Sequence, residues 1–149
     1  MPPSLTPSKV HFHFLEGVQF KLNKRRELKS FIELLFKKEK KRLAVINYIL
    51  CTDKYLLNIN RQFLQHDYYT DIITFGLSDP DEPISAEIYI SVDRVKDNAL
   101  EFGSSYKKEM HRVLFHGALH LCGYKDKKKK DAVIMRKMED KYITLYFSR

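Results

Sequence analysis

Alternating and helical spacings of apolar residues divide the chain into short strands and amphipathic helices. Residues 9–15 and 84–91 alternate apolar with polar side chains, which is typical of strands with one buried face. Residues 25–40 and 129–147 repeat apolar side chains every three or four positions, which predicts helices. The pattern predicts strands at 9–15, 43–50, 71–75 and 84–91, and helices at 25–40, after Thr52 or Asp53, from Ser91 to Gly103, after Ser104 or Ser105, and at about 129–147. The predicted buried faces are Leu56, Ile59 and Phe63 on the second helix, and Ile134, Met138, Tyr142 and Leu145 on the last.

The order of these elements indicates one α+β domain. A strand, a helix and an almost wholly apolar strand at 43–50 suggest a right-handed crossover between two parallel strands. We expect a small mixed sheet of about four strands with about five helices, mainly on one side of the sheet. Residues 1–8 contain several prolines and no apolar run, so we interpret them as a mobile leader and residues 9–149 as the single domain.

The segment from His116 to Asp126, which reads His-Gly-Ala-Leu-His-Leu-Cys-Gly-Tyr-Lys-Asp, carries the strongest chemical signal. His116 and His120 are four residues apart in a helical pattern, so both imidazoles leave the same side of one helix. Gly123 follows the last periodic residue, where glycine can end the helix and turn the chain back. Asp126 can then be a third ligand. Two nitrogens and one oxygen are typical of a catalytic zinc site, which keeps one position open for water.

The same spacing occurs in zinc proteases with the motif His-Glu-x-x-His-x-x-Gly-x-x-His, where Asp126 would replace the last histidine. Position 117 is glycine, although the protease motif has there the glutamate that takes a proton from the metal-bound water. A metalloprotease-like hydrolase is therefore one alternative. Another is a non-catalytic ribosome-binding or RNA-binding module in which the metal only stabilises the fold.

The charge of the chain favours a polyanionic partner. Lysine and arginine outnumber aspartate and glutamate by 27 to 19, which gives a net charge of +8. Lys125 and residues 127–130 form a basic cluster beside the expected metal, and we interpret it as attracting phosphate. The basic residues within 37–42 close a helix, so we interpret them as a solvated helix end. Two distant cysteines and the lack of a long apolar run favour a reduced cytoplasm and no membrane association.

The segment that begins at His116 resembles the signature His-Gly-x-Leu-His-Leu-x-Gly-Tyr-Asp-His of the YbeY-like metallo-endoribonucleases. The closing Asp-His of that signature is Lys125-Asp126 here, so the resemblance implies a carboxylate where the family mostly has imidazole. Residues 70–75 are similar to a second family motif, Thr-Asp-Val-Leu-Ser-Phe, and residues 85–91 look like a family strand. The resemblance therefore covers most of the chain.

The resemblance implies a zinc-dependent endoribonuclease that cleaves single-stranded RNA, with 16S rRNA 3′-end maturation and ribosome quality control as its setting. It implies one zinc per chain, a zincin-like metal helix packed on the sheet, and partners that include the small-subunit rRNA and the ribosome. No nucleotide cofactor is expected, and the expected location is the cytoplasm of a bacterium.

Site residues follow from the resemblance and the charge pattern together. The expected metal ligands are His116, His120 and Asp126, and the expected catalytic group is a metal-bound water, with no side-chain base assigned. An arginine of the family falls on Leu64, so Arg61 or His66 is expected to take its place. The remaining expected contacts are Lys125, Lys127 and Lys128 with RNA, and Asp71 and Glu87 with a metal ligand or the metal helix.

Overall fold

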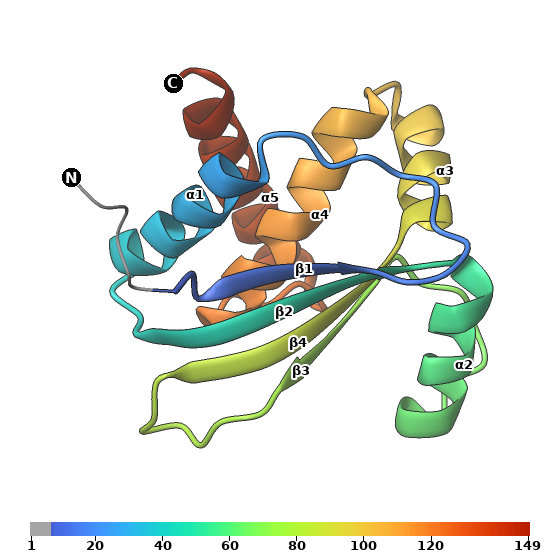
Figure 1. Cartoon of the computed structure of the whole chain (residues 1–149), viewed down its shortest axis with the longest axis horizontal. Coiled ribbons are helices and arrows are strands. Elements are labelled where there is room, and N and C mark those ends of the chain that lie inside the picture. Colours follow the sequence, from blue (N-terminus) through green and yellow to red (C-terminus); the bar gives the residue numbers. More distant parts are fainter. Residues whose placement is uncertain (1–6) are drawn as a thin grey trace.

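Four strands form one mixed sheet in the order β1-β2-β4-β3, with β1, β2 and β4 parallel and β3 antiparallel to β4. The structure, a computed structural model, describes residues 7–149; the leader predicted at 1–8 lies mostly outside the described residues. It confirms the predicted α+β class (Figure 1). The elements are β1 (Val10–Phe14), α1 (Arg25–Lys38), β2 (Leu43–Cys51), α2 (Asp53–Leu64), β3 (Ile72–Gly76), β4 (Ile84–Ser91), α3 (Val92–Phe102), α4 (Tyr106–Leu121) and α5 (Lys129–Phe147).

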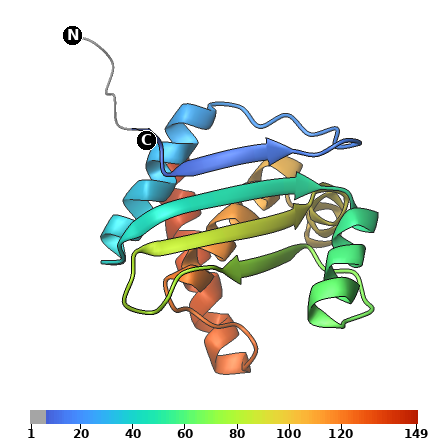
Figure 2. The same cartoon turned by 60° about the horizontal axis from the view of Figure 1, so that its bottom comes forward.

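One face of the sheet carries the main core beneath α1, α4 and α5, which lie together on that side (Figures 1 and 2). The parallel register places Tyr48 of β2 beside Ile88 of β4, and both side chains are fully buried. Tyr48 donates a 2.8 Å hydrogen bond to the carbonyl oxygen of Leu114 in α4, which fixes this helix on the sheet. The opposite face has a smaller core, in which α2 packs near the end of β2.

The predicted helix ends agree with the structure because local signals determine them. The hydroxyls of Thr52, Ser91 and Ser105 each accept a hydrogen bond from a backbone N–H in the first turn of α2, α3 and α4. Gly123 has φ +110°, a left-handed value that suits glycine, and the chain turns there toward Asp126.

Each predicted buried face has one wrong residue, whereas the others, Leu56, Ile59, Met138, Tyr142 and Leu145, are buried or packed against a core. Phe63 of α2 has 61% of its surface exposed, and Ile134 of α5 has 43% exposed. The buried residues are Leu56, Leu57 and Asn60 on α2, and Met135, Glu139, Tyr142, Ile143 and Tyr146 on α5. The buried face of α5 includes Glu139, and this explains the wrong residue on that helix. A prediction from the spacing of apolar residues omits a charged residue, because its burial depends on partners in another helix. Across residues 7–149, none of the helices combines the length and the apolar character needed to cross a membrane.

Candidate metal site and active site

A cavity of about 500 Å³ lies beside the second half of α4, and it brings together the three predicted metal ligands. His116 and His120 reach it from successive turns of α4, and Asp126 reaches it from the loop that follows Gly123. Asp71 lines it from the start of β3. The other described residues in its lining are Thr70, Ile72, Thr74, Asn98, Phe102, Glu109, Arg112, Val113, Arg136 and Glu139.

The distance between two of the donors suits a shared metal ion. Nε2 of His116 lies 3.2 Å from Oδ2 of Asp126. Two ligands at about 2.0–2.1 Å from one tetrahedral zinc would be about 3.3 Å apart. Among residues 7–149, no three His, Cys, Asp or Glu side chains are already grouped around one metal position. The three side chains therefore carry the donor atoms that zinc prefers, and the distance between His116 and Asp126 fits a shared ion. His120, which is exposed on the next turn of α4, would be the third ligand when a metal binds.

The second nitrogen of His116 is held by a buried glutamate of α5. Nδ1 of His116 is 2.7 Å from Oε2 of Glu139, whose other oxygen is 3.2 Å from Nη1 of Arg112. Metal-binding histidines commonly donate their second ring nitrogen to a carboxylate, which fixes the ring and its tautomer. Glu139 thus leaves Nε2 of His116 facing Asp126. Sequence reasoning missed Glu139, because its role depends on α4 and α5 packing together.

Burial and the neighbouring carboxylates have opposite effects on the pKa of His116. Burial lowers the pKa of His116, but the hydrogen bond to Glu139 and the charges of Glu139, Asp126 and Asp71 outweigh it, so the pKa of His116 is raised. Burial raises the pKa of Asp71, although His116 opposes that shift. Three carboxylates therefore act on one imidazole, and such an arrangement favours a cation beside it.

The two carboxylates predicted to assist the ligands differ in position. Asp71 lies in the cavity, where its Oδ2 accepts a 3.2 Å hydrogen bond from Asn98. Glu87 does not reach the metal helix. It lies on the sheet face opposite Ile88, which packs against α4, and Tyr89 donates a 3.4 Å hydrogen bond to it there. The contact predicted between Glu87 and the metal helix is therefore wrong.

Arginines of α4 and α5, and not the residues predicted to replace the family arginine, line the cavity. Arg136, with 54% of its side chain exposed, stands at the cavity and is 3.6 Å from Glu139. Arg61 instead forms an ion pair with Asp67, and His66 stacks on Tyr68 with ring centroids 5.1 Å apart. Arg61 and His66 are not part of the cavity lining, so their contact with RNA stays a prediction.

The lysines predicted to contact RNA lie close to Asp126 in the sequence and are exposed. Lys125 and Lys127 flank Asp126, and Lys128 is the residue just before α5. None of the three is in the lining of the cavity, so their binding to RNA also stays a prediction. Their exposure suits contact with a strand that passes over the cavity mouth.

Gly117 faces the sheet and not the cavity. A Cβ atom at this position would lie 3.0 Å from the Cδ1 atoms of both Ile72 and Ile88. Real Cβ atoms almost never approach so closely, so glycine is required by the contact between α4 and the sheet. A glutamate at position 117 would point into the core, which is an observation against the protease-like alternative.

Comparison with known proteins places this arrangement in a family. A sequence profile described as "Endoribonuclease YbeY" matches residues 16–146, and the chain belongs to this family. The protein is 51% identical to "Endoribonuclease YbeY" of Cytophaga hutchinsonii over 90% of this chain and 94% of that relative. It is 45% identical to the protein of the same name from Bacteroides thetaiotaomicron over 87% of this chain and 94% of that relative.

A solved structure supports the same fold. The solution structure of TM1509 from Thermotoga maritima matches with a TM-score of 0.61 and 30% sequence identity. The match covers 93% of this chain and 89% of that one, so the shared fold extends through both proteins.

Proposed function

We propose that this protein is a zinc-dependent endoribonuclease that cleaves single-stranded RNA. The observation that carries the proposal is the orientation of His116, whose Nδ1 is held by buried Glu139 and whose Nε2 faces Asp126 in a cavity. Membership in a family described as "Endoribonuclease YbeY" supports RNA as the substrate class. His116, His120 and Asp126 would hold one zinc per chain.

Each residue of the cavity would have a separate role in such a site. A bound zinc would supply Lewis-acid chemistry, polarising a phosphoryl oxygen and acidifying the attacking hydroxyl or water. Glu139 orients His116, and Arg112 keeps the charge of Glu139 compensated inside the protein. Arg136, at the cavity and largely exposed, is placed to hold a phosphate of the strand. Asp71, fixed by Asn98, adds a carboxylate to the same wall.

The biological setting proposed is bacterial ribosome maturation. We assign the protein to 16S rRNA 3′-end processing and ribosome quality control in the cytoplasm, with the small-subunit rRNA and the ribosome as partners. Family membership and the net charge of +8 support this setting. Lys125, Lys127 and Lys128, exposed around the ligand loop, would contact the RNA backbone.

RNA cleavage by site variants tests the proposal. End-labelled single-stranded RNA is incubated with zinc-loaded wild type, His116→Ala, Asp126→Ala and His13→Ala. His13 is an exposed histidine of β1 that bonds to Asn47, so its variant is the control for the loss of a histidine in His116→Ala. Cleavage should be retained in His13→Ala and reduced at least about a hundredfold in His116→Ala and Asp126→Ala, with circular dichroism unchanged in all three.

Two results would point to the alternatives. No cleavage by the zinc-loaded wild type would favour a non-catalytic RNA-binding or ribosome-binding module, whereas full cleavage by Asp126→Ala would exclude Asp126 as a ligand of the catalytic metal. Cleavage of casein or of a peptide library by the wild type would favour a protease. We expect no peptide cleavage, because position 117 cannot carry a base that faces the cavity.

A further inference from the structure

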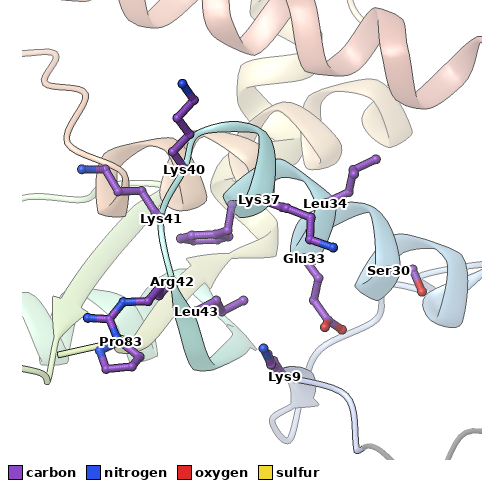
Figure 3. Close-up of a pocket in the computed structure, with 11 residues that line it drawn as sticks. Lys9, Ser30, Glu33, Leu34, Lys37, Lys40, Lys41, Arg42, Leu43 and Pro83 are labelled. Carbon is purple, nitrogen blue, oxygen red and sulfur yellow. The ribbon is translucent and has the colours of Figure 1, made fainter.

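A second cavity, of about 740 Å³, lies where α1 ends and β2 begins, and basic side chains surround it (Figure 3). We call it the cationic hollow and define it by Lys9, Lys37, Lys40, Lys41 and Arg42. All five side chains are exposed. One carboxylate, Glu33, is among the described residues that line it, and it accepts a 3.3 Å hydrogen bond from Ser8. The hollow therefore has a large excess of positive charge.

The structure shows why this charge is not cancelled locally. The sequence around the turn, Lys-Lys-Glu-Lys-Lys-Arg, contains one acid, Glu39, which is directed inward. One oxygen of Glu39 accepts a 2.8 Å hydrogen bond from Tyr124, and the other accepts one from Tyr142. Within residues 7–149, none of the five cations of the hollow forms an ion pair with a carboxylate.

The backbone of the turn favours glycine, yet it carries a lysine. Lys41 N–H bonds to the carbonyl of Phe36, and Lys40 N–H bonds to that of Lys37, which together form a Schellman motif. Lys40 takes the left-handed position of this motif with φ +59°. Glycine is the usual residue there because other residues are strained. A cation at the strained position is an observation that suggests a role for its charge.

A smaller hollow connects this region with the end of the metal helix. Its volume is about 380 Å³, and Lys40, Lys41 and Arg42 line one side of it. Leu121, the residue after His120, and residues of the loop between β3 and β4 line the other side. Both this hollow and the active-site cavity lie along the seam between α4 and the edge strand β3. A strand that leaves the active-site cavity past His120 would therefore reach the cationic hollow.

We propose that the cationic hollow binds the phosphodiester backbone of single-stranded RNA and holds the part of the strand that extends beyond the cleavage position. The inference rests on the proposed function for the choice of RNA. The hollow would act without base specificity, since lysine and arginine contacts to phosphate carry no sequence information. It replaces the interpretation of residues 37–42 as a merely solvated helix end.

The shape of the surface favours an RNA strand over an anionic membrane. The five cations line a hollow, with Lys40 and Lys41 projecting outward at its edge (Figure 3), whereas a membrane would require a continuous flat basic face. Leu34, with 41% of its surface exposed, adds an apolar patch in the same hollow, against which an unpaired base can pack. A single strand has both the phosphates and the exposed bases that match this lining.

The test compares two glycine substitutions at left-handed lysines. Lys40→Gly removes a charge from the hollow, and Lys24→Gly removes the same charge from the opposite end of α1, where Lys24 has φ +54°. Glycine suits both positions, so both variants should fold. Binding of a fluorescent 15-nucleotide 2′-O-methyl RNA is measured by anisotropy in EDTA at several salt concentrations, so that cleavage does not enter the result.

Lys40→Gly should weaken binding about fivefold at 0.1 M salt and reduce the slope of log K against log salt by about 0.7, the contribution of one phosphate contact on a single strand. Lys24→Gly should change the affinity less than about twofold. A combined Lys37→Gln, Lys40→Gly, Lys41→Gln variant should lose at least about tenfold, since up to three contacts are removed.

Three other outcomes would overturn the inference, and they are distinguishable. Equal effects of the two glycine variants would show that only net charge matters, and the proposed RNA cleavage would be untouched by that result. RNA binding unaffected by Lys40→Gly, together with a Lys40-dependent binding to phosphatidylserine vesicles, would assign the hollow to a membrane. A wild type that binds no RNA in EDTA would remove this inference, and the cleavage assay with zinc-loaded protein would still decide the proposed function.

Discussion

The active-site cavity and the cationic hollow differ in how their charges are balanced. Around His116, each charged group contacts a partner: Glu139 holds the imidazole, and Arg112 is within 3.2 Å of Glu139. Around Lys40, the cations are exposed and the neighbouring Glu39 bonds to tyrosines instead. Buried charge requires compensation and so gives fixed geometry, whereas exposed charge tolerates imbalance and so gives long-range attraction. The first region suits chemistry, and the second suits the holding of a flexible polyanion.

The largest effect on stability should come from removing the carboxylate that balances the cavity. Glu139→Ala removes the carboxylate that pairs with both His116 and the buried Arg112, which keeps Asp140 and Glu109, and it should lower the free energy of unfolding by about 2–4 kcal/mol. Urea unfolding of the metal-free protein measures it. Glu101→Ala, on the exposed side of α3, should stay within about 0.5 kcal/mol of wild type. A loss below about 1 kcal/mol for Glu139→Ala would show that the cavity charges are not coupled in this way.

A change at Gly117 tests whether the metal helix depends on close contact with the sheet. Gly117→Ala should cost about 1–3 kcal/mol, because its Cβ would meet Ile72 and Ile88 at 3.0 Å. Gly117→Glu should cost more and abolish folding or metal binding. The matched control is Gly76→Ala, since nothing lies within 4 Å of a Cβ there. If thermal unfolding showed both alanine variants to be equally stable, the contact would not explain the glycine.

A second histidine of α4, the buried His111, tests by its pH dependence whether a buried charge requires a compensating partner. His111 has a backbone carbonyl as partner, at 2.7 Å from Nδ1, in place of a carboxylate. Burial lowers the pKa of His111, so the unfolded chain binds the proton more readily. Its contribution to stability is present above the unfolded pKa of about 6.5 and is lost as the pH falls through that value. The loss of stability between pH 7 and pH 5 should be smaller in His111→Gln, measured by urea unfolding at each pH; an unchanged pH dependence would contradict the assignment.

The smallest effect concerns the turn of the cationic hollow. Lys40→Gly should leave the free energy of unfolding unchanged or raise it by up to about 1 kcal/mol, since glycine relieves the left-handed strain at φ +59°. Lys24→Gly provides the comparison at φ +54°. Differential scanning calorimetry resolves shifts of this size. A marked destabilisation by Lys40→Gly alone would mean that the lysine serves the fold and not a ligand.

Local signals made most of the fold and the ligand segment predictable. Ser91 and Ser105 cap helices where expected, and the spacing of His116, His120 and Asp126 leads all three to one cavity. The alternation of β4 also predicts that Glu87 points away from Ile88. The role given to Glu87 from the family resemblance conflicted with that alternation, and the structure agrees with the alternation.

The supporting groups were not predictable because they depend on contacts between distant elements. Glu139 occupies the buried stripe of α5 only because His116 and Arg112 meet it from α4. Arg136 also lines the cavity, because the face of α5 that carries Glu139 packs toward α4. The excess charge of the hollow likewise depends on Glu39 turning inward to Tyr142, which is 103 residues further along the chain. A search for acids within an apolar helical stripe would have indicated Glu139.

The most direct test of the central claim is the zinc content of tag-free protein, measured by elemental analysis for wild type and His116→Ala in parallel. We expect about one zinc per chain in the wild type and its loss in the variant, with both proteins folded. Zinc retained at the same stoichiometry in folded His116→Ala would contradict the assignment of the cavity as the metal site.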